Sequence, residues 1–537
     1  MKKIKLITTL SSLGALTAAT PIVATSCSNS AENYIVYNGE KISMLGSATA
    51  ADILKFVPAD YTDPTLPAAE QATYKAICID GRYYDITKIS ELSIGCCEDA
   101  AKIPANFLQG CVSLKRLNLR GVKGVMKIGA NFCKDCKSLG QLVLPTLRAL
   151  TNEEFITSYN DSNTYGQLPD NFLYYDDCPS LTSVDFTGFA NLCIIPDQFM
   201  ALSPVIENVD LSPLKNVRSI GDNVLWECGN LRNIKLPNMK TLSMEYKGKQ
   251  CTWLPQVGDN FLANNVFLND VDFTPFAEVA LIGDDFLHTR AEEFYISLDM
   301  KTVDMSKLTH VHRIGKNFLK DLSYVTTVKL PTMVKCDIEH VINKLDKEYI
   351  SGEPTIGNYF LAKTHGMINS EPVIVESQIK NIDLTPLKAL KQIPDGFLSG
   401  NINLEKIDLS VLANVEKIGA KFLSCCTSLK DVDFSTMAAL QKVGKVSSMN
   451  PVIGQDLFFG CNSLTRVDMG DIVPANVDSD TPSTTSGSFI KVDWSAEEDP
   501  RFESIKLVSP YLNAFQTKFP KKVWTATTAE YFRDLIN

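Results

Sequence analysis

The sequence predicts an α/β solenoid, a stack of short repeats that share one parallel β-sheet. Three observations support this prediction. A 13-residue block like VDLSPLKNVRSIG, at residues 209–221, recurs along the chain. A phenylalanine follows the closing Ile-Gly or Ile-Pro of nearly every copy. The shortest spacing between the starts of successive copies is 25 residues, and it occurs four times. Units of this size cannot bury their apolar faces alone, so they bury them by stacking.

The full repeat unit reads I-G-x-x-F-L-x-x-C-x-S-L-x-x-V-D-L. The apolar residues around its aspartate are two positions apart, a spacing that puts both on one face of a short strand. The Ile and Phe are four positions apart, which suits one helical or 3₁₀ turn on the return side. Twelve copies begin at residues 103, 128, 168, 195, 220, 257, 282, 314, 356, 393, 418 and 453. The period and the L-x-x-V-x-L ending are typical of leucine-rich repeats.

The segments outside the repeats are interpreted as a leader, a linker, two caps and a loop. Caps are expected because the terminal face of an open stack exposes apolar surface. The predicted organisation is a lipoprotein signal peptide that is removed (1–26), a lipid-anchored linker (27–32), an N-terminal cap (33–100), the solenoid (101–478), a loop (479–491), and a terminal repeat with a C-terminal cap (492–537).

The leader begins with a lysine-rich segment, continues through apolar and small residues at 6–24, and ends in Ala24-Thr25-Ser26-Cys27. Small residues before a cleavage site are what a signal peptidase accepts. The last four residues resemble the lipobox of bacterial lipoproteins, [LVI]-[AST]-[GAS]-Cys, and depart from it at Ala24. The resemblance implies that Cys27 carries a diacylglyceryl group and anchors the chain on the outer side of the cell membrane. The alternative is an ordinary secretory signal with an incidental cysteine.

Composition and motifs exclude several functions. The net charge is −10, from 52 basic and 62 acidic residues, which argues against nucleic acid as a partner. No G-x-S-x-G, H-E-x-x-H or phosphate-binding loop is present, so no catalytic residue and no cofactor are predicted. His310 and His312 could ligate a metal ion, but their position in a variable turn favours a solvated loop. An enzyme remains an alternative only if its site lies in the cap or the insertions.

One repeat position holds a cysteine in six units. These residues could form disulfides or a metal site, but a small, buried packing residue is the favoured interpretation. The six are Cys111, Cys136, Cys178, Cys228, Cys426 and Cys461.

The outward position of the predicted strands is usually an aspartate, interrupted by lysines. The longest uninterrupted run, here called the acidic row, is Asp383, Asp408, Asp433 and Asp468, from four successive units. Like charges at strand spacing repel, so something must offset them. Solvation with hydrogen bonds from turn amides is the favoured explanation. The alternative is that the acidic row binds a cation or a basic partner.

The F-x-x-C-x-S-L core of the unit resembles the BspA-like leucine-rich repeats of bacterial and protist surface proteins. The resemblance covers about residues 100–475, and residues 505–524 look like a closing unit. It implies a surface protein for adhesion or host interaction. We therefore expect a lipid-anchored, non-catalytic protein that binds an unknown extracellular or host protein. The alternative from another class is a lipid-anchored component that binds a solute or polymer for uptake.

Overall fold

The structure is a computed structural model. It describes residues 34–37, 41–45, 48–79, 81–160, 167–175, 177–289, 300–338, 340–341, 352–368, 371–446, 451–477, 506–511 and 514. The predicted signal peptide, Cys27, the linker 27–32 and the loop 479–491 lie outside the described residues. The chain forms two compact units, unit 1 (Met1–Met239) and unit 2 (Lys240–Asn537).

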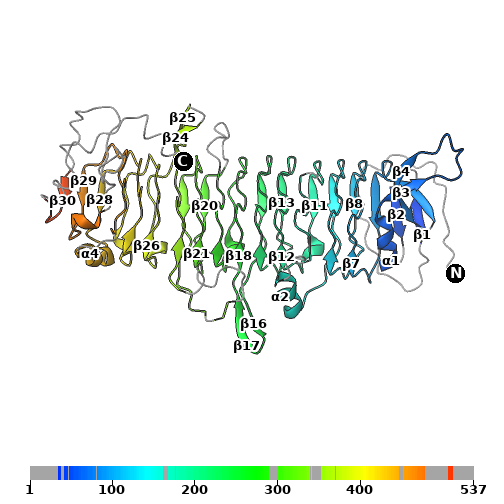
Figure 1. Cartoon of the computed structure of the whole chain (residues 1–537), viewed down its shortest axis with the longest axis horizontal. Coiled ribbons are helices and arrows are strands. Elements are labelled where there is room, and N and C mark those ends of the chain that lie inside the picture. The colour runs from blue at the N-terminus through cyan, green and yellow to red at the C-terminus, as the bar shows by residue number, and fades with distance from the viewer. Residues whose placement is uncertain are drawn as a thin grey trace. The chain divides into compact units, whose positions relative to one another are not determined.

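Unit 1 begins with strands that differ from the repeats (Figure 1). β1 (Tyr34–Tyr37) pairs antiparallel with β2 (Lys41–Leu45), and β2 pairs parallel with β6 (Glu91–Ile94). The parallel sheet therefore starts inside the segment expected to be a cap. Between these strands lie α1, a 3₁₀ turn and a small antiparallel sheet. Their bounds are α1 (Ala50–Ile53), η1 (Leu54–Phe56), β3 (Ala59–Thr62), β4 (Thr73–Ile79) and β5 (Arg82–Asp85).

The repeats of unit 1 each contribute a strand from the V-D position, and all but the one that begins at residue 168 add a shorter strand from the Ile-Gly position. Leu117, Leu142 and Val184 are matched in register in a six-stranded sheet ordered β1-β2-β6-β8-β10-β11. The elements are β7 (Lys102–Ile103), β8 (Arg116–Asn118), β9 (Lys127–Ile128), β10 (Gln141–Val143), α2 (Asn152–Asn160), β11 (Ser183–Asp185), η2 (Thr187–Phe189), β12 (Ile194–Ile195), β13 (Asn208–Asp210), β14 (Ser219–Ile220) and β15 (Asn233–Lys235).

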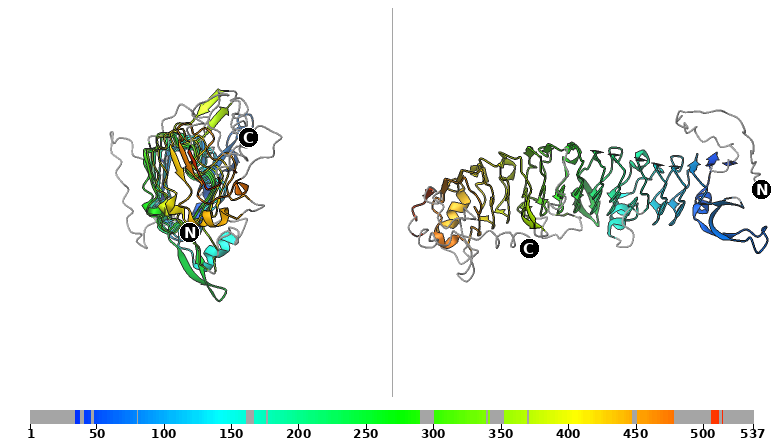
Figure 2. Two further views of the ribbon diagram at one scale, coloured as in Figure 1. Left: turned by 90° about the vertical axis from the view of Figure 1, so that its left-hand side faces the viewer. Right: turned by 90° about the horizontal axis from the view of Figure 1, so that it is seen from above.

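Unit 2 repeats the same arrangement, with two hairpins added (Figures 1 and 2). The hairpins are β16 (Leu242–Tyr246) with β17 (Lys249–Trp253), and β24 (His365–Ile368) with β25 (Glu371–Ile374). The repeat strands are β18 (Gln256–Val257), β19 (Leu281–Ile282), β20 (Thr302–Asp304), β21 (Arg313–Ile314), β22 (Thr327–Lys329), β23 (Thr355–Ile356), β26 (Gln392–Ile393), β27 (Lys417–Ile418), β28 (Asp431–Asp433), β29 (Arg466–Asp468) and β30 (Lys506–Val508). The helical turns are η3 (Thr274–Phe276), η4 (Thr385–Leu387), η5 (Ser410–Leu412), α4 (Ala438–Gly444) and η6 (Pro474–Asn476).

The leucine-rich repeat prediction thus agrees with stacked parallel strands in each unit. The strands fall into several separate sheets, so the single continuous sheet and the count of twelve repeats stay predictions.

The repeat phenylalanines form a stacked column inside each unit. In unit 2, Phe397 lies between Phe360 and Phe422, with ring centroids 5.4 and 5.9 Å away and nearly parallel planes. In unit 1, Phe107 and Phe132 stack at 5.6 Å. Phe261, Phe286, Phe397 and Phe422, at this repeat position in unit 2, are each fully buried. A column of stacked rings from one repeat position therefore forms part of the core of each unit.

The turn around each phenylalanine is neither helical nor 3₁₀, so that part of the prediction is wrong. Asn106 and Leu108, on either side of Phe107, have φ of 61° and 55°, in the left-handed region. This conformation aims their N–H groups in opposite directions along the stack. Asn106 donates forward to the carbonyl of Ala130 at 2.8 Å, and Leu108 donates backward to that of Phe56 at 2.9 Å. Hydrogen bonds between rungs therefore replace those that a helical turn would make within one rung.

Candidate functional site

The acidic row is occupied by local hydrogen bonds. Asp408 Oδ1 accepts the N–H and hydroxyl of Ser410, at 2.9 and 2.6 Å. Asp433 Oδ1 accepts the same two groups of Ser435, also at 2.9 and 2.6 Å. Asp383 and Asp468 each accept the amide two residues later, at 2.9 and 3.0 Å. The hydrogen bonds from Thr385 also lower the pKa of Asp383. Turn amides thus bind every member of the row, as the favoured explanation expected.

The lysines that interrupt the predicted series of aspartates neutralise their neighbours. Lys235 contacts Asp210 at 2.9 Å, and Lys329 contacts Asp304 at 2.7 Å. Bonding to Lys329 and to Ser306 lowers the pKa of Asp304 to about 2.

Within the acidic row, only Asp468 has such a partner, because Arg466 contacts it at 2.6 Å. In the described part of the chain, Asp383, Asp408 and Asp433 form no ion pair.

The structure brings only part of the acidic row into strand pairing. Asp433 and Asp468 are directly matched in β28 and β29. Asp383 and Asp408 are exposed and lie two residues before the 3₁₀ turns η4 and η5, outside any strand of the structure. Of the four aspartates of the acidic row, therefore, only Asp433 and Asp468 show the expected spacing of paired strands.

The cysteine position is a buried thiol, and the packing interpretation is confirmed. All six of these cysteines are free and buried. Most also donate a hydrogen bond to a carbonyl of the preceding rung: Cys136 to Leu108, Cys178 to Cys133, Cys228 to Met200, Cys426 to Leu398 and Cys461 to Leu423, at 3.2–3.5 Å. Burial raises the pKa of Cys228 to about 12, so this thiol stays protonated at neutral pH.

Neither His310 nor His312 contacts side chains that could bind a metal ion together with it. His310 is exposed and contacts Thr309. His312 is buried and its Nδ1 lies 2.9 Å from the carbonyl oxygen of Val334. The expectation that both lie in a solvated loop is wrong for His312, which is a structural residue. Over the described residues, no group of three or more His, Cys, Asp or Glu side chains could hold a metal ion. None of the helices among the described residues is long and apolar enough to cross a membrane.

A buried charged cluster in unit 2 was not predicted. The Asp321 side chain is 1% exposed and accepts the N–H and hydroxyl of Thr364, at 2.5 and 2.7 Å. Lys320 Nζ lies 3.5 Å from it. Lys363 Nζ is buried without a hydrogen-bond partner, and burial lowers its pKa to about 8. These residues occupy variable positions of the repeat, where a repeat pattern carries no signal.

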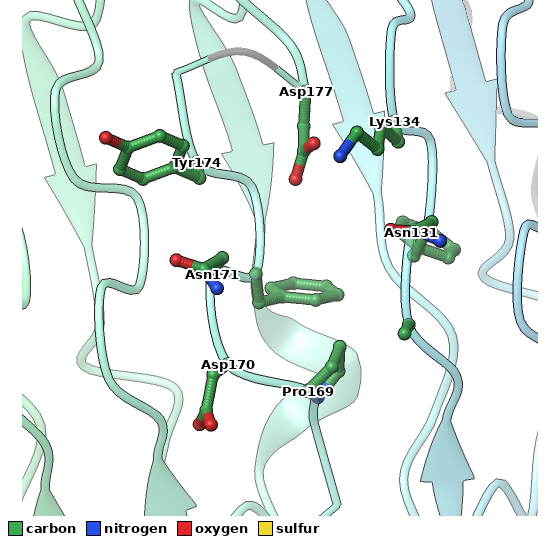
Figure 3. A pocket seen from close by; sticks show the side chains of 10 residues that line it. Asn131, Lys134, Pro169, Asp170, Asn171, Tyr174 and Asp177 are labelled. Carbon is green, nitrogen blue, oxygen red and sulfur yellow. The ribbon is translucent and has the colours of Figure 1, made fainter.

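A cleft of about 340 Å³ in unit 1 was also missed (Figure 3). It lies between the rung of Asn131 and the rung of Asn171, which are separated in sequence by the insertion that contains α2. Lys134, Tyr174 and Asp177 also line it. The one available signal was the insertion near residues 151–166, which lengthens the spacing at this junction.

Comparison with known proteins supports the repeat assignment. Residues 171–251 and 375–473 match the BspA type leucine-rich repeat region, in six copies. No curated protein matches the chain. A leucine-rich cell surface protein of Faecalibacterium prausnitzii is 14% identical, with 89% of this chain and 98% of that chain covered and a TM-score of 0.24. The functional domain of InlJ from Listeria monocytogenes, described as including a cysteine ladder, is 12% identical, with 72% and 70% covered and a TM-score of 0.19. Residues 171–251 and 375–473 of this chain are BspA-type leucine-rich repeats.

Proposed function

We propose that this chain is a non-catalytic protein of the cell surface, anchored through a lipid on Cys27, that binds another protein. The observation that carries the proposal is the repeat array itself, with its BspA-type units and buried phenylalanine columns. Hydrogen bonds between rungs and a packed core fix the backbone of the repeats before a partner binds. Binding then costs little additional conformational entropy, which is an advantage for a surface that recognises a large partner.

The acidic row is the proposed contact surface of unit 2. Asp408 and Asp433 each use Oδ1 for local hydrogen bonds, and their Oδ2 atoms accept no hydrogen bond from the described residues. Because the local bonds fix the carboxylates and the turn needs only one oxygen, the second oxygen is available to a cation on a partner. A basic surface would be attracted to such a row, and its association rate would depend on salt.

The proposal is tested by capture experiments with residues 28–537 immobilised through one terminus. Host matrix and serum proteins, and extracellular proteins of the same cells, are passed over the surface at low and physiological salt. The expected result is saturable, stoichiometric binding of a protein with a basic patch. Saturable binding of a free solute or polymer with no protein bound would favour the uptake alternative. Turnover of a bound molecule would contradict a non-catalytic role.

A further inference from the structure

The small antiparallel sheet of β3, β4 and β5 in unit 1 carries three tyrosines on one face. In the β3–β4 pairing, Tyr61 is matched with Tyr74. In the β4–β5 pairing, Tyr83 is matched with Cys78, four residues beyond Tyr74. Because residues four apart on a strand point to the same side, the three rings share a face. Their contacts agree, since Tyr61 stacks on Tyr83 with ring centroids 3.7 Å apart and meets Tyr74 edge-on at 5.6 Å. We call these three rings the tyrosine face.

The opposite face of the same sheet packs into the core of unit 1. Ile77 and Ile79 of β4 and Tyr84 of β5 alternate with the residues of the tyrosine face, and all three side chains are buried. The tyrosine face therefore points away from the core. Tyr83 is 49% exposed, and Tyr61 and Tyr74 are partly exposed, so the face is open to solvent.

Exposed apolar side chains are concentrated in this part of the chain. Eleven large apolar or aromatic side chains are exposed among the described residues, and three of them lie between residues 54 and 83. Besides Tyr83 they are Leu54, in the 3₁₀ turn η1 that contacts β4, and Leu66, in the connection between β3 and β4. A concentration of exposed apolar groups indicates an interaction surface.

Charge does not select the partner of this face. Asp85, two residues beyond Tyr83 on the same side of β5, accepts the N–H and hydroxyl of Thr87 at 2.9 and 2.6 Å and lies 3.4 Å from Lys88. Its carboxylate is therefore largely satisfied within the sheet. A partner is then recognised by the aromatic rings rather than by an electrostatic field.

The proposed lipid on Cys27 determines which surface lies next to this sheet. The first described strand, β1, begins at Tyr34, seven residues after Cys27. A chain of that length spans at most about 25 Å when fully extended. The strands β1 to β5 lie together at the start of unit 1 (Figures 1 and 2). A lipid anchor at Cys27 would therefore keep the tyrosine face close to a bilayer.

The chemistry of tyrosine suits the surface of a bilayer. Its ring is apolar and its hydroxyl stays hydrated, which matches the boundary between acyl chains and headgroups. The anchor also makes the contact intramolecular, so that even a weak interaction is populated. We propose that the tyrosine face rests on the bilayer, with its rings among the lipid headgroups. The inference rests on the proposed lipid anchor, and the second contact would fix the orientation of unit 1 on the membrane.

The test is photolabelling of the mature, acylated chain in phosphatidylcholine vesicles that contain a lipid with a diazirine on its acyl chain close to the headgroup. Tryptic peptides 56–75 and 83–88 carry the tyrosine face. Peptide 321–329 is the internal control, because its Tyr324 is 44% exposed, close to the value for Tyr83. The two sheet peptides should take up at least about fivefold more label than the control. The intact mass of the same preparation shows whether Cys27 is acylated.

A variant tests whether the three rings act together. Tyr83→Ser removes one ring and leaves Tyr61 and Tyr74 as reporters, so label on peptide 56–75 should fall by at least about threefold. Tyr324→Ser is the matched control and should leave that label unchanged. Circular dichroism checks that both variants fold. If Tyr83→Ser does not fold, the comparison of peptides in the wild type decides the proposal.

The outcomes separate the tyrosine face from the anchor. An acylated chain whose sheet peptides take up no more label than peptide 321–329 overturns the proposal and leaves the anchor in place. A chain without acyl groups contradicts the anchor; label concentrated on peptide 83–88 would then still support the face, and its absence would overturn it. Sedimentation of the detergent-solubilised chain tests the other occupant. A dimer that Tyr83→Ser dissociates would assign the face to a second copy and overturn the bilayer contact.

Discussion

The thiol of Cys461 donates a hydrogen bond to the carbonyl oxygen of Leu423, one rung earlier, at 3.2 Å. Leu423 is in the left-handed region, with φ of 59°, and this conformation turns its carbonyl toward the interior. In the unit of Phe397, Asn401 holds the cysteine position and donates to the carbonyls of Leu361 and Leu398 at 2.9 and 2.8 Å. In the unit of Phe318 the same position holds Leu322, which has no donor. A hydrogen-bond donor is therefore common at this position, but the fold does not require one.

Substitutions at Cys461 separate the contribution of its hydrogen bond from the contribution of its side-chain volume. Cys461→Val keeps a similar volume and removes the donor, so unfolding of unit 2 should become easier by about 1–2 kcal/mol. Cys461→Ser keeps a donor and should lose less. Chemical denaturation with circular dichroism measures both. If the serine variant were the less stable of the two, apolar packing alone would explain the cysteine.

Truncation of one column phenylalanine should damage the stack locally. Phe397→Ala removes a fully buried ring that stacks on both neighbours, and the transfer and cavity terms together should cost about 3–5 kcal/mol. Because rungs couple mainly to adjacent rungs, exchange of amide hydrogens should rise most near residues 356–430. Mass spectrometry of peptides from unit 1 provides the internal control. A uniform rise across both units would contradict the local coupling.

Removal of charge from the acidic row tests its role in partner binding. Asp408→Asn with Asp433→Asn preserves size and an oxygen acceptor for the turn while it removes two charges. If the row binds a basic partner, affinity should fall and its dependence on salt should flatten. Asp337→Asn with Glu416→Gln removes two charges elsewhere in unit 2 and is the matched control. Unchanged affinity for every partner would end the hypothesis and would leave the repeat fold unaffected.

The buried amine of Lys363 should make stability depend on pH. Its pKa is about 8 in the folded chain against 10.5 when exposed, so the folded state binds fewer protons between these values. Unit 2 of the wild type should therefore gain stability as pH rises from about 8 toward 10.5. Lys363→Met should remove this dependence and stabilise unit 2 at pH 7 by up to about 3 kcal/mol, at 1.36 kcal/mol per pKa unit.

Thermal scans of unit 2 from pH 7 to 10.5 measure this effect. Lys388→Met, at an exposed lysine of the same unit, is the control and should leave the curve unchanged. Identical curves for Lys363→Met and the wild type would show that the amine is solvated in the folded chain.

The lipid anchor depends on one thiol. Cys27→Ala removes the predicted acceptor, so the precursor should remain uncleaved by the lipoprotein peptidase and should carry no acyl chain. Metabolic labelling with palmitate, followed by membrane fractionation, measures this. Equal label on the wild type and the variant would contradict the assignment, whereas labelled wild type alone would support it.

The sequence predicted those features that every repeat shares, because each copy is an independent observation of the same environment. The buried phenylalanines, the buried cysteines and the Asx-type hydrogen bonds of the acidic row were all recognisable in this way. The left-handed turns were not. Asn106, Asn131 and Asn171 precede the phenylalanine and tolerate positive φ, but Leu108 and Leu423 after it are residue types that carry no such signal.

Features that occur once could not be inferred from a repeat pattern. Lys363 and Asp321 occupy the same position of successive units and meet because rungs stack, and the residue type at that position changes from copy to copy. The cleft between the rungs of Asn131 and Asn171 depends on how that one junction packs, which no composition or spacing encodes. The insertion before residue 167 marked the place but gave no information about its chemistry.

The opposed N–H groups on either side of Phe107 have a consequence for how such a chain can change in length. Asn106 bonds forward and Leu108 bonds backward, so a rung offers the same two connections to whichever rung precedes or follows it. Duplication or loss of one whole 25-residue unit then leaves no new unpaired amide at the seam. Gain of a partial unit would break both connections. Repeat number is thus open to variation by recombination between copies, provided that the residues around the phenylalanine are gained or lost as a whole.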